Sequence, residues 1–151
     1  MIYDEGWGEA KAIESCTVWA DQDFVTVTCA AHAVDYLDEL SRAIWPNGGR
    51  AVTLQVGQWP DLENAPLRIS MDYDAGRAAV RWVPDGGWGV EPNVAPHHED
   101  LHVLVDSHEP VETIAACKAR VTPGGVRRAM WEYATTGQRP SSLEWRAELD
   151  V

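Results

Sequence analysis

Alternating apolar and polar residues mark several short segments of the chain as half-buried strands. In residues 67–73 every second residue is apolar and large, with Arg, Ser and Asp between them. A period of two also runs through residues 51–57, 101–105 and 143–149. Side chains alternate between the two faces of a strand, so each of these segments has an apolar and a polar face. The pattern predicts a sheet with one face buried against other elements.

Turn residues join further strands into hairpins. Residues 16–20 and 24–29 form a predicted hairpin that is closed by a short acidic turn. The turn Asp74-Ala75-Gly76 leads from the strand at 67–73 into another strand at 78–83. Gly76 suits the positive φ that such turns require.

Helical spacing of apolar residues appears twice. The first predicted helix covers about 36–45, with Asp35 as its N-cap. The second covers about 123–135, where Thr122 can cap the start and Gly137 can end the helix. Proline at the first helical position of this segment supports the same start.

Two helices are too few to cross over between all of these strands. We therefore predict an α+β fold, a mainly antiparallel sheet of about six to seven strands with two helices packed on one face. The chain, residues 1–151, is expected to form one domain, with residues 1–14 poorly ordered. The Gly- and Pro-rich segment 84–100 is expected to be one long connection, and connections of that length are often functional.

Composition agrees with a globular protein and limits its partners. The chain has 151 residues, of which 45% are hydrophobic and 24% charged, and its net charge is −12. That charge opposes binding to nucleic-acid phosphates and to anionic membranes. No apolar run reaches the ~18 residues of a membrane span, and the N-terminus is acidic where a secretory signal would be basic. We expect a cytoplasmic protein that binds neither nucleic acid nor membranes.

The acidic charge is unevenly distributed along the chain. Residues 82–117 contain seven acidic residues and neither Lys nor Arg. One interpretation is a solvated surface that keeps the protein soluble. The other is a concentrated negative face that meets a positively charged partner.

Motifs for catalysis are missing from the sequence. It has no P-loop, GxGxxG, GxSxG or HExxH pattern, and its three widely spaced cysteines predict reduced thiols rather than a disulfide framework. The best metal candidate is the run His97-His98-Glu99-Asp100-x-His102. On a strand, His98 and His102 would lie about 13 Å apart, too far to share one ion. We predict no catalytic residue, no metal and no cofactor. A metal-dependent small-molecule enzyme that uses His97, His98 and His102 is kept as an alternative.

Trp88 stands in the run Asp85-Gly86-Gly87-Trp88-Gly89, where glycines flank it on both sides. An aromatic residue on a flexible acidic loop is typical of a binding hot spot, where Trp is enriched and charges steer the encounter. The alternative is that Trp88 packs back onto the sheet.

Residues 121–145, VTPGGVRRAMWEYATTGQRPSSLEW, carry a pattern that opens a helix at Val121-Thr122-Pro123 and leads into the last strand at Trp145. This segment resembles the closing part of a family of actinobacterial immunity proteins. Those proteins belong to bacterial polymorphic toxin systems and are typically encoded beside deaminase-type toxins. The likeness covers about 34–146. It departs from the family at Gly124-Gly125, where helix-favouring polar residues are expected, and the hairpin at 16–29 has no counterpart.

The resemblance implies an α+β fold and inhibition of a cognate toxin by direct binding, without enzymatic activity. Because a nucleic-acid-targeting toxin needs a basic groove for phosphates, an acidic protein could occlude that surface. We therefore predict an immunity protein, either a monomer or a homodimer, that neutralises such a toxin, with a generic protein-interaction module as a further alternative. The predicted toxin-binding residues are Asp85, Trp88, Glu91, Glu99 and Asp100.

Overall fold

A computed structural model describes residues 16–58, 60–108, 110–148 and 151. The prediction for residues 1–14 lies outside the described residues. The strands are β1 (Cys16–Ala20), β2 (Asp23–Thr26), β3 (Ala51–Gln58), β4 (Leu67–Asp72), β5 (Arg77–Trp82), β6 (Gly87–Val90), β7 (Leu101–Val103), β8 (Glu112–Ile114) and β9 (Glu144–Arg146). The helices are α2 (Ala30–Leu40), the short 3-10 helix η1 (Ala116–Lys118) and α3 (Pro123–Thr136).

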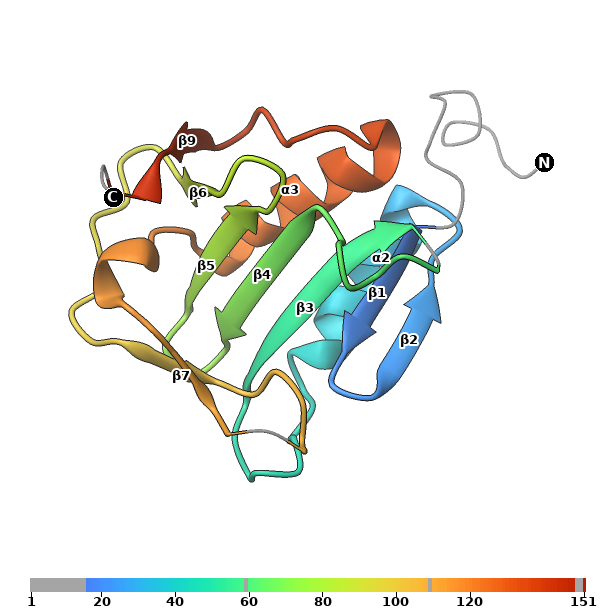
Figure 1. The fold of residues 1–151 in the computed structure, drawn as a ribbon, viewed down its shortest axis with the longest axis horizontal. Coiled ribbons are helices and arrows are strands. Elements are labelled where there is room, and N and C mark those ends of the chain that lie inside the picture. The colour runs from blue at the N-terminus through green and yellow to red at the C-terminus, as the bar shows by residue number, and fades with distance from the viewer. Residues whose placement is uncertain (1–15, 59, 109, 149–150) are drawn as a thin grey trace.

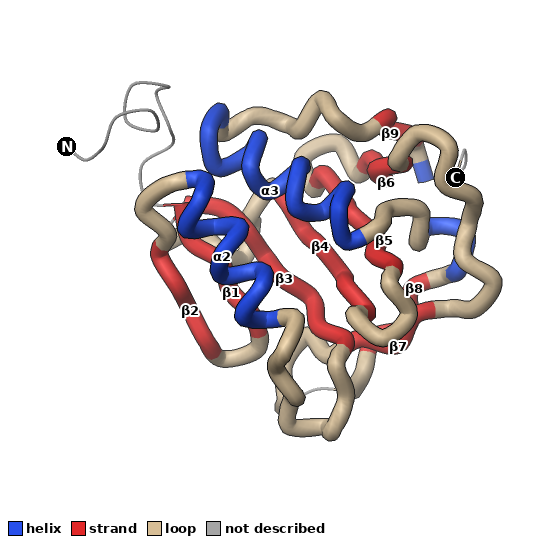
Figure 2. The backbone as a smooth tube through the Cα atoms, turned by 180° about the vertical axis from the view of Figure 1, so that it is seen from behind, coloured by secondary structure: helices blue, strands red, loops and turns tan. Residues whose placement is uncertain are grey.

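The main sheet has seven strands in the order β2-β1-β3-β4-β5-β6-β9, and every neighbouring pair is antiparallel (Figure 1). Helices α2 and α3 lie together across one face of this sheet (Figure 2). The predicted α+β class is confirmed, as is the predicted placement of both helices on one face.

Strand β4 shows how the sequence pattern divides the sheet. Leu67, Ile69 and Met71 are buried in the core beneath the helices. Arg68 and Ser70 point to the opposite face, as their alternate positions predict. This core also contains the inward residues of β1 and β3 and the apolar side of both helices, so most of the buried apolar area lies on the helix side.

Helix α3 begins and ends where its sequence predicts. The Thr122 hydroxyl accepts a hydrogen bond from the backbone N–H of Gly125 at 3.2 Å, and Pro123 occupies the first turn. Gly137 ends the helix with φ of 70°, a left-handed conformation that favours glycine.

The first helix starts and ends earlier than predicted. Asp35 lies inside α2, and the N-cap is Cys29, whose Sγ accepts a hydrogen bond from the backbone N–H of His32 at 3.4 Å. The helix ends before Ser41, and Ile44 is 73% exposed. The predicted range was wrong because it includes Ile44 as a continuation of the helical spacing of Leu37 and Leu40. In the structure the buried alanines Ala30 and Ala33 continue the apolar stripe toward the N-terminus instead.

The segment 84–100 is not one long loop. Gly87–Val90 form strand β6, which joins β5 to β9 in the main sheet. The glycines allow close packing there, because a Cβ on Gly89 would lie 2.7 Å from the Leu143 side chain. Strand β8 was not predicted, and the last strand is shorter than the predicted 143–149.

A two-stranded hairpin of β7 and β8 lies on the helix-free face of the main sheet (Figure 1). A parallel bridge between Val52 and Leu104 ties it to β3. The hairpin covers a second, smaller apolar cluster, whose buried members are Ala51, Ala79, Trp88, Leu101, Val103, Ile114 and Ala119. The helix-free face is therefore partly covered by the hairpin and partly open.

The three cysteines are free thiols, and burial raises the pKa of Cys16 to about 12.

Candidate interaction surface

Trp88 lies in β6 and is only 7% exposed. Its indole N–H donates to a carboxylate oxygen of Glu148 at 2.8 Å. Two cations lie over its ring, Lys118 at 4.7 Å and Arg81 at 5.1 Å from the ring centre. The indole is thus enclosed by the hairpin cluster and by charged side chains on the helix-free face. The sequence-based interpretation in which Trp88 packs onto the sheet describes its position.

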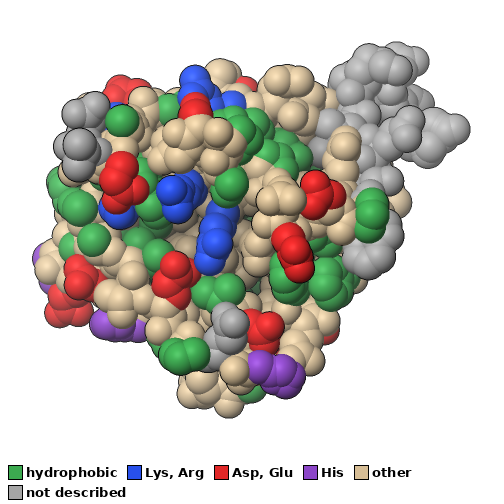
Figure 3. All heavy atoms as spheres, in the orientation of Figure 1, with side chains coloured by type: hydrophobic (Ala, Val, Ile, Leu, Met, Phe, Trp, Pro, Cys, Tyr) green, Lys and Arg blue, Asp and Glu red, His purple; other side chains and the backbone are tan. Residues whose placement is uncertain are grey.

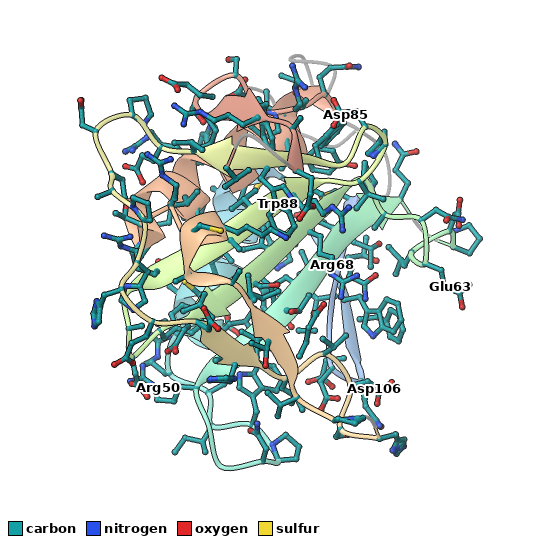
Figure 4. All side chains as sticks on the ribbon, turned by 60° about the vertical axis from the view of Figure 1, so that its left-hand side comes forward. Arg50, Glu63, Arg68, Asp85, Trp88 and Asp106 are labelled. Atoms are coloured by element: carbon teal, nitrogen blue, oxygen red, sulfur yellow. The ribbon has the colours of Figure 1, made fainter. Side chains whose placement is uncertain are left out.

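Asp85 occupies the turn between β5 and β6, and its side chain is 52% exposed. One carboxylate oxygen accepts a hydrogen bond from the backbone N–H of Gly87 at 2.8 Å. The other pairs with Arg139 at 2.9 Å. Figure 4 shows Asp85 at the margin of the molecule, whereas Trp88 and Arg68 lie over the sheet. Asp85 therefore shapes the turn and carries a charge that is already paired.

Glu91 follows β6 and caps the start of α3. One carboxylate oxygen accepts hydrogen bonds from the backbone N–H of Thr122 at 2.8 Å and from its hydroxyl at 2.7 Å. The other oxygen pairs with Arg128 at 3.1 Å, and the Glu91 side chain is 14% exposed. A Cβ on Gly125 would collide with this carboxylate. The glycine that departs from the expected helix sequence is thus required by the close approach of Glu91.

Glu99 and Asp100 immediately precede the β7–β8 hairpin and are both exposed. The Asp100 carboxylate accepts a hydrogen bond from the backbone N–H of Ala116 at 2.8 Å, which ties this segment to η1. Glu99 is 77% exposed, and one of its carboxylate oxygens lies 4.0 Å from Nε2 of His98. The structure brings these two residues together but separates them from Asp85, which lies at the other end of β6.

The histidines do not converge. His97 and His98 contact each other through their rings at 4.4 Å, while His102 on β7 makes a hydrogen bond to the Thr113 hydroxyl at 3.1 Å. Within the described residues, no group of three or more His, Cys, Asp or Glu side chains is arranged to hold a metal ion.

Arginines from distant parts of the sequence partly neutralise the acidic segment 82–117. Arg139 pairs with Asp85 and Arg128 with Glu91, while Arg68 from β4 pairs with Glu112 at 3.2 Å. Each of these is a tertiary contact between residues far apart in the sequence. The charge of the segment at the surface is therefore lower than its composition suggests, and among the described residues no Lys or Arg pairs with Glu99.

Sequence reasoning missed the cations of the helix-free face. Arg68 and Arg81 occupy polar positions of alternating strands, so their shared face was predictable from the pattern. Their pairing as direct cross-strand neighbours required the register. Figure 3 shows Lys and Arg side chains gathered near the middle of this face, with acidic side chains around them.

Comparison with known proteins assigns the chain to a family. No helix in the described part of the chain combines the length and the apolar character needed to cross a membrane. No curated protein matches the sequence. The family model described as immunity protein Imm1 matches residues 22–147, which begins before the region of likeness seen in the sequence and includes β2. Because this match covers most of the chain, the chain belongs to the Imm1 family of immunity proteins.

Proposed function

We propose that this protein neutralises a cognate bacterial toxin domain by binding it directly, without chemistry of its own. The observation that carries the proposal is the match of the immunity protein Imm1 family over residues 22–147. The proposal also names the cellular compartment and the class of toxin. Neutralisation takes place in the cytoplasm of the producing cell, and the toxin is a deaminase-type enzyme that acts on nucleic acid.

Electrostatics supports an acidic inhibitor for such a toxin. An enzyme that acts on nucleic acid needs a positive surface for phosphates and a pocket for the target base. A protein with a net charge of −12 would meet that surface quickly and compete with the substrate. Protection also requires tight binding, and a nanomolar dissociation constant corresponds to about −12 kcal/mol.

We propose that the acidic residues Asp85, Glu91, Glu99 and Asp100 form or support the toxin-binding surface, with Glu99 at its centre. Its carboxylate is more exposed than those of Asp85 and Glu91, and no Lys or Arg of the described residues pairs with it. Glu91 and Asp85 contribute through the turn and helix start that they hold in place. Trp88 contributes from beneath the surface by supporting the cations that lie over its ring.

Co-expression with the toxin domain encoded beside this gene tests the proposal. We expect survival of cells that express both proteins, and co-purification of the two chains as a complex. Growth arrest in the presence of this protein, together with separate elution of the two chains, would remove the proposed function.

Glu99→Lys tests the acidic surface within that function. Because exposed interface charges act mainly on the encounter, we expect a lower association rate and a weaker dependence of that rate on salt. Glu63→Lys is the matched control, since Glu63 is an exposed acidic residue in the connection between β3 and β4, away from this surface (Figure 4). Equal association rates for the two variants would contradict the assignment of Glu99.

A further inference from the structure

The register of the main sheet places one row of side chains across the helix-free face. Cross-strand partners share a face, and their side chains lie side by side. The paired positions run from Gln55 on β3 to Arg68 on β4, Arg81 on β5, Trp88 on β6 and Arg146 on β9. An acidic protein thus carries three arginines and a tryptophan in one line.

A cavity of about 40 Å³ opens within this row. Arg68, Arg81 and Trp88 line it together with Ser70, Glu112 and others. A site needs at least about 10–15 Å³ of such volume to admit one water molecule. The cavity therefore admits one small polar group, such as a carboxylate. Figure 4 shows Arg68 and Trp88 lying over the same side of the sheet.

Arg81 is a residue of this cavity with a buried hydrogen-bond donor that has no acceptor. Its Nε is buried and has no hydrogen-bond partner. Within the described part of the chain it forms no ion pair, whereas Arg68 is paired with Glu112 and Lys118 with Glu148. Buried donors are normally satisfied, and one that is not calls for a physical explanation. An anion that enters the cavity would supply the missing acceptor.

The guanidinium of Arg81 is also held in place for such a partner. It stacks over the Trp88 ring, which is itself fixed by its hydrogen bond to Glu148. A guanidinium offers two parallel N–H donors that match the two oxygens of a carboxylate. A positioned arginine loses less conformational freedom on binding than a free one.

The surroundings favour one carboxylate over a nucleic-acid strand. Glu112 and Glu148 lie beside the cations of this face. A strand of phosphates would extend its charge past the cavity and meet these carboxylates and the net charge of −12. A single acidic side chain interacts mainly within the Debye length of about 8 Å. Arg81 lines the cavity and forms no ion pair among the described residues, so it can interact with such a side chain there.

We infer that the cavity between Arg68 and Arg81 receives a carboxylate from an acidic segment of the toxin domain. This inference rests on the proposed function and adds a second, oppositely charged contact to it. The acidic surface near Glu99 meets the positive part of the toxin, and Arg81 binds one Asp or Glu side chain of the same partner. Arginine and tryptophan are the residue types that most often dominate the affinity of protein interfaces.

The test is the affinity of the full-length protein for the toxin domain encoded beside its gene, at about 0.15 M salt. We expect Arg81→Met to weaken binding at least about tenfold, because the apolar stem remains but the charge and its donors are lost. Arg42→Met is the matched control, since Arg42 is exposed beyond the end of α2, and we expect its affinity to stay within about twofold of the wild type. Arg81→Lys keeps the charge, and we expect an intermediate loss.

A double-mutant cycle identifies the partner group. Each Asp and Glu of the toxin surface is changed to Asn or Gln, and we expect one of these changes to cost nothing further in the Arg81→Met background. Additive losses for every toxin carboxylate would overturn the inference. So would Arg81→Met binding within about twofold of the wild type, although wild-type binding would then leave the proposed function standing.

Two further outcomes separate the alternatives. A wild-type protein that does not bind the toxin removes both the proposed function and this inference. Binding of a labelled single-stranded DNA oligonucleotide by the wild type, lost in Arg81→Met, would assign the cavity to phosphate and overturn the inference. Melting temperatures of all variants are measured alongside, and Arg81→Lys serves as the test if Arg81→Met is unstable.

Discussion

The two faces of the main sheet are made by the same strands but serve different ends. On β4, Ile69 packs into the core beneath α2 and α3, while its neighbour Arg68 lines a cavity on the opposite side. The helix side is apolar and closed. The helix-free side is partly covered by the β7–β8 hairpin and otherwise carries a row of arginines beside Trp88.

Under the proposed function, this difference separates the residues that stabilise the fold from those that bind the toxin. Burying apolar surface contributes about 25 cal/mol per Å², so the helix side holds most of the folding free energy. Polar and cationic side chains on the open side add little to stability but remain available to a partner. Substitutions on the helix side should therefore lower the free energy of unfolding more than substitutions on the open side. Trp88 is the expected exception, because it lies on the helix-free face but is buried there.

Trp88→Ala is expected to have the largest effect on stability, although Trp88 lies on the helix-free face, because its side chain is buried there. We expect the free energy of unfolding to fall by about 3–5 kcal/mol through lost burial and the cavity left behind. Denaturant unfolding measures this, with Trp131→Ala as the control because Trp131 on α3 is 50% exposed. Similar midpoints for both variants would show that Trp88 is not a packing residue.

Ile69→Ala and Arg68→Ala compare the two faces directly at adjacent positions. We expect Ile69→Ala to lower the free energy of unfolding by about 3 kcal/mol, since Ile69 is fully buried. Arg68→Ala removes a partly exposed ion pair and should cost less than about 1 kcal/mol. Equal losses from the two substitutions would refute the division of roles between the faces.

Gly125→Ala tests the close contact between the Glu91 carboxylate and the first turn of α3. The added Cβ would displace the Glu91 carboxylate and lie 2.8 Å from Val121, so we expect a loss of about 1–2 kcal/mol. At Gly124 the nearest atom to an added Cβ is the Thr122 hydroxyl at 3.9 Å, so Gly124→Ala should be neutral or stabilising by up to about 1 kcal/mol. Thermal unfolding of both variants checks the difference, and a stabilising Gly125→Ala would contradict it.

The smallest expected effect is a pH response of the Trp88 environment. Hydrogen bonds from Lys118 and from Trp88 lower the pKa of Glu148 below its ordinary value of 4.5. A depressed pKa means that the contact is complete above pH 4.5 and is lost as the pH falls through the lower folded-state value. The indole N–H resonance of Trp88 should therefore move with a midpoint below pH 4.5. Glu148→Gln should abolish that movement, and a midpoint above 4.5 would contradict the contact.

Local signals in the sequence predicted the elements that have strong local causes. The caps of α3 at Thr122 and Gly137 were correct because side-chain and glycine chemistry sets them within one turn. The start of α2 was missed because a cysteine serves as its N-cap, a residue type that carries no such preference. Strand β6 was missed because its pairing with β5 and β9, rather than its glycine-rich composition, makes it a strand.

The candidate surface was less predictable than the fold. Charge counting found the acidic segment 82–117 but not the arginines that neutralise part of it, because Arg128 and Arg139 approach Glu91 and Asp85 only after folding. The same holds for Trp88, whose flanking glycines predicted exposure while the hairpin and Lys118 enclose it.

The sequence alone determined the fold class, the apolar side of alternating strands such as β4 and the ends of the second helix. Those features depend on periodicity and on side chains within a few residues of each other. Only the tertiary structure decided that Arg68, Arg81 and Trp88 lie in one row beside a cavity. Strand order and register set that arrangement, and both arise from the packing of the whole sheet against its helices and hairpin rather than from any one segment.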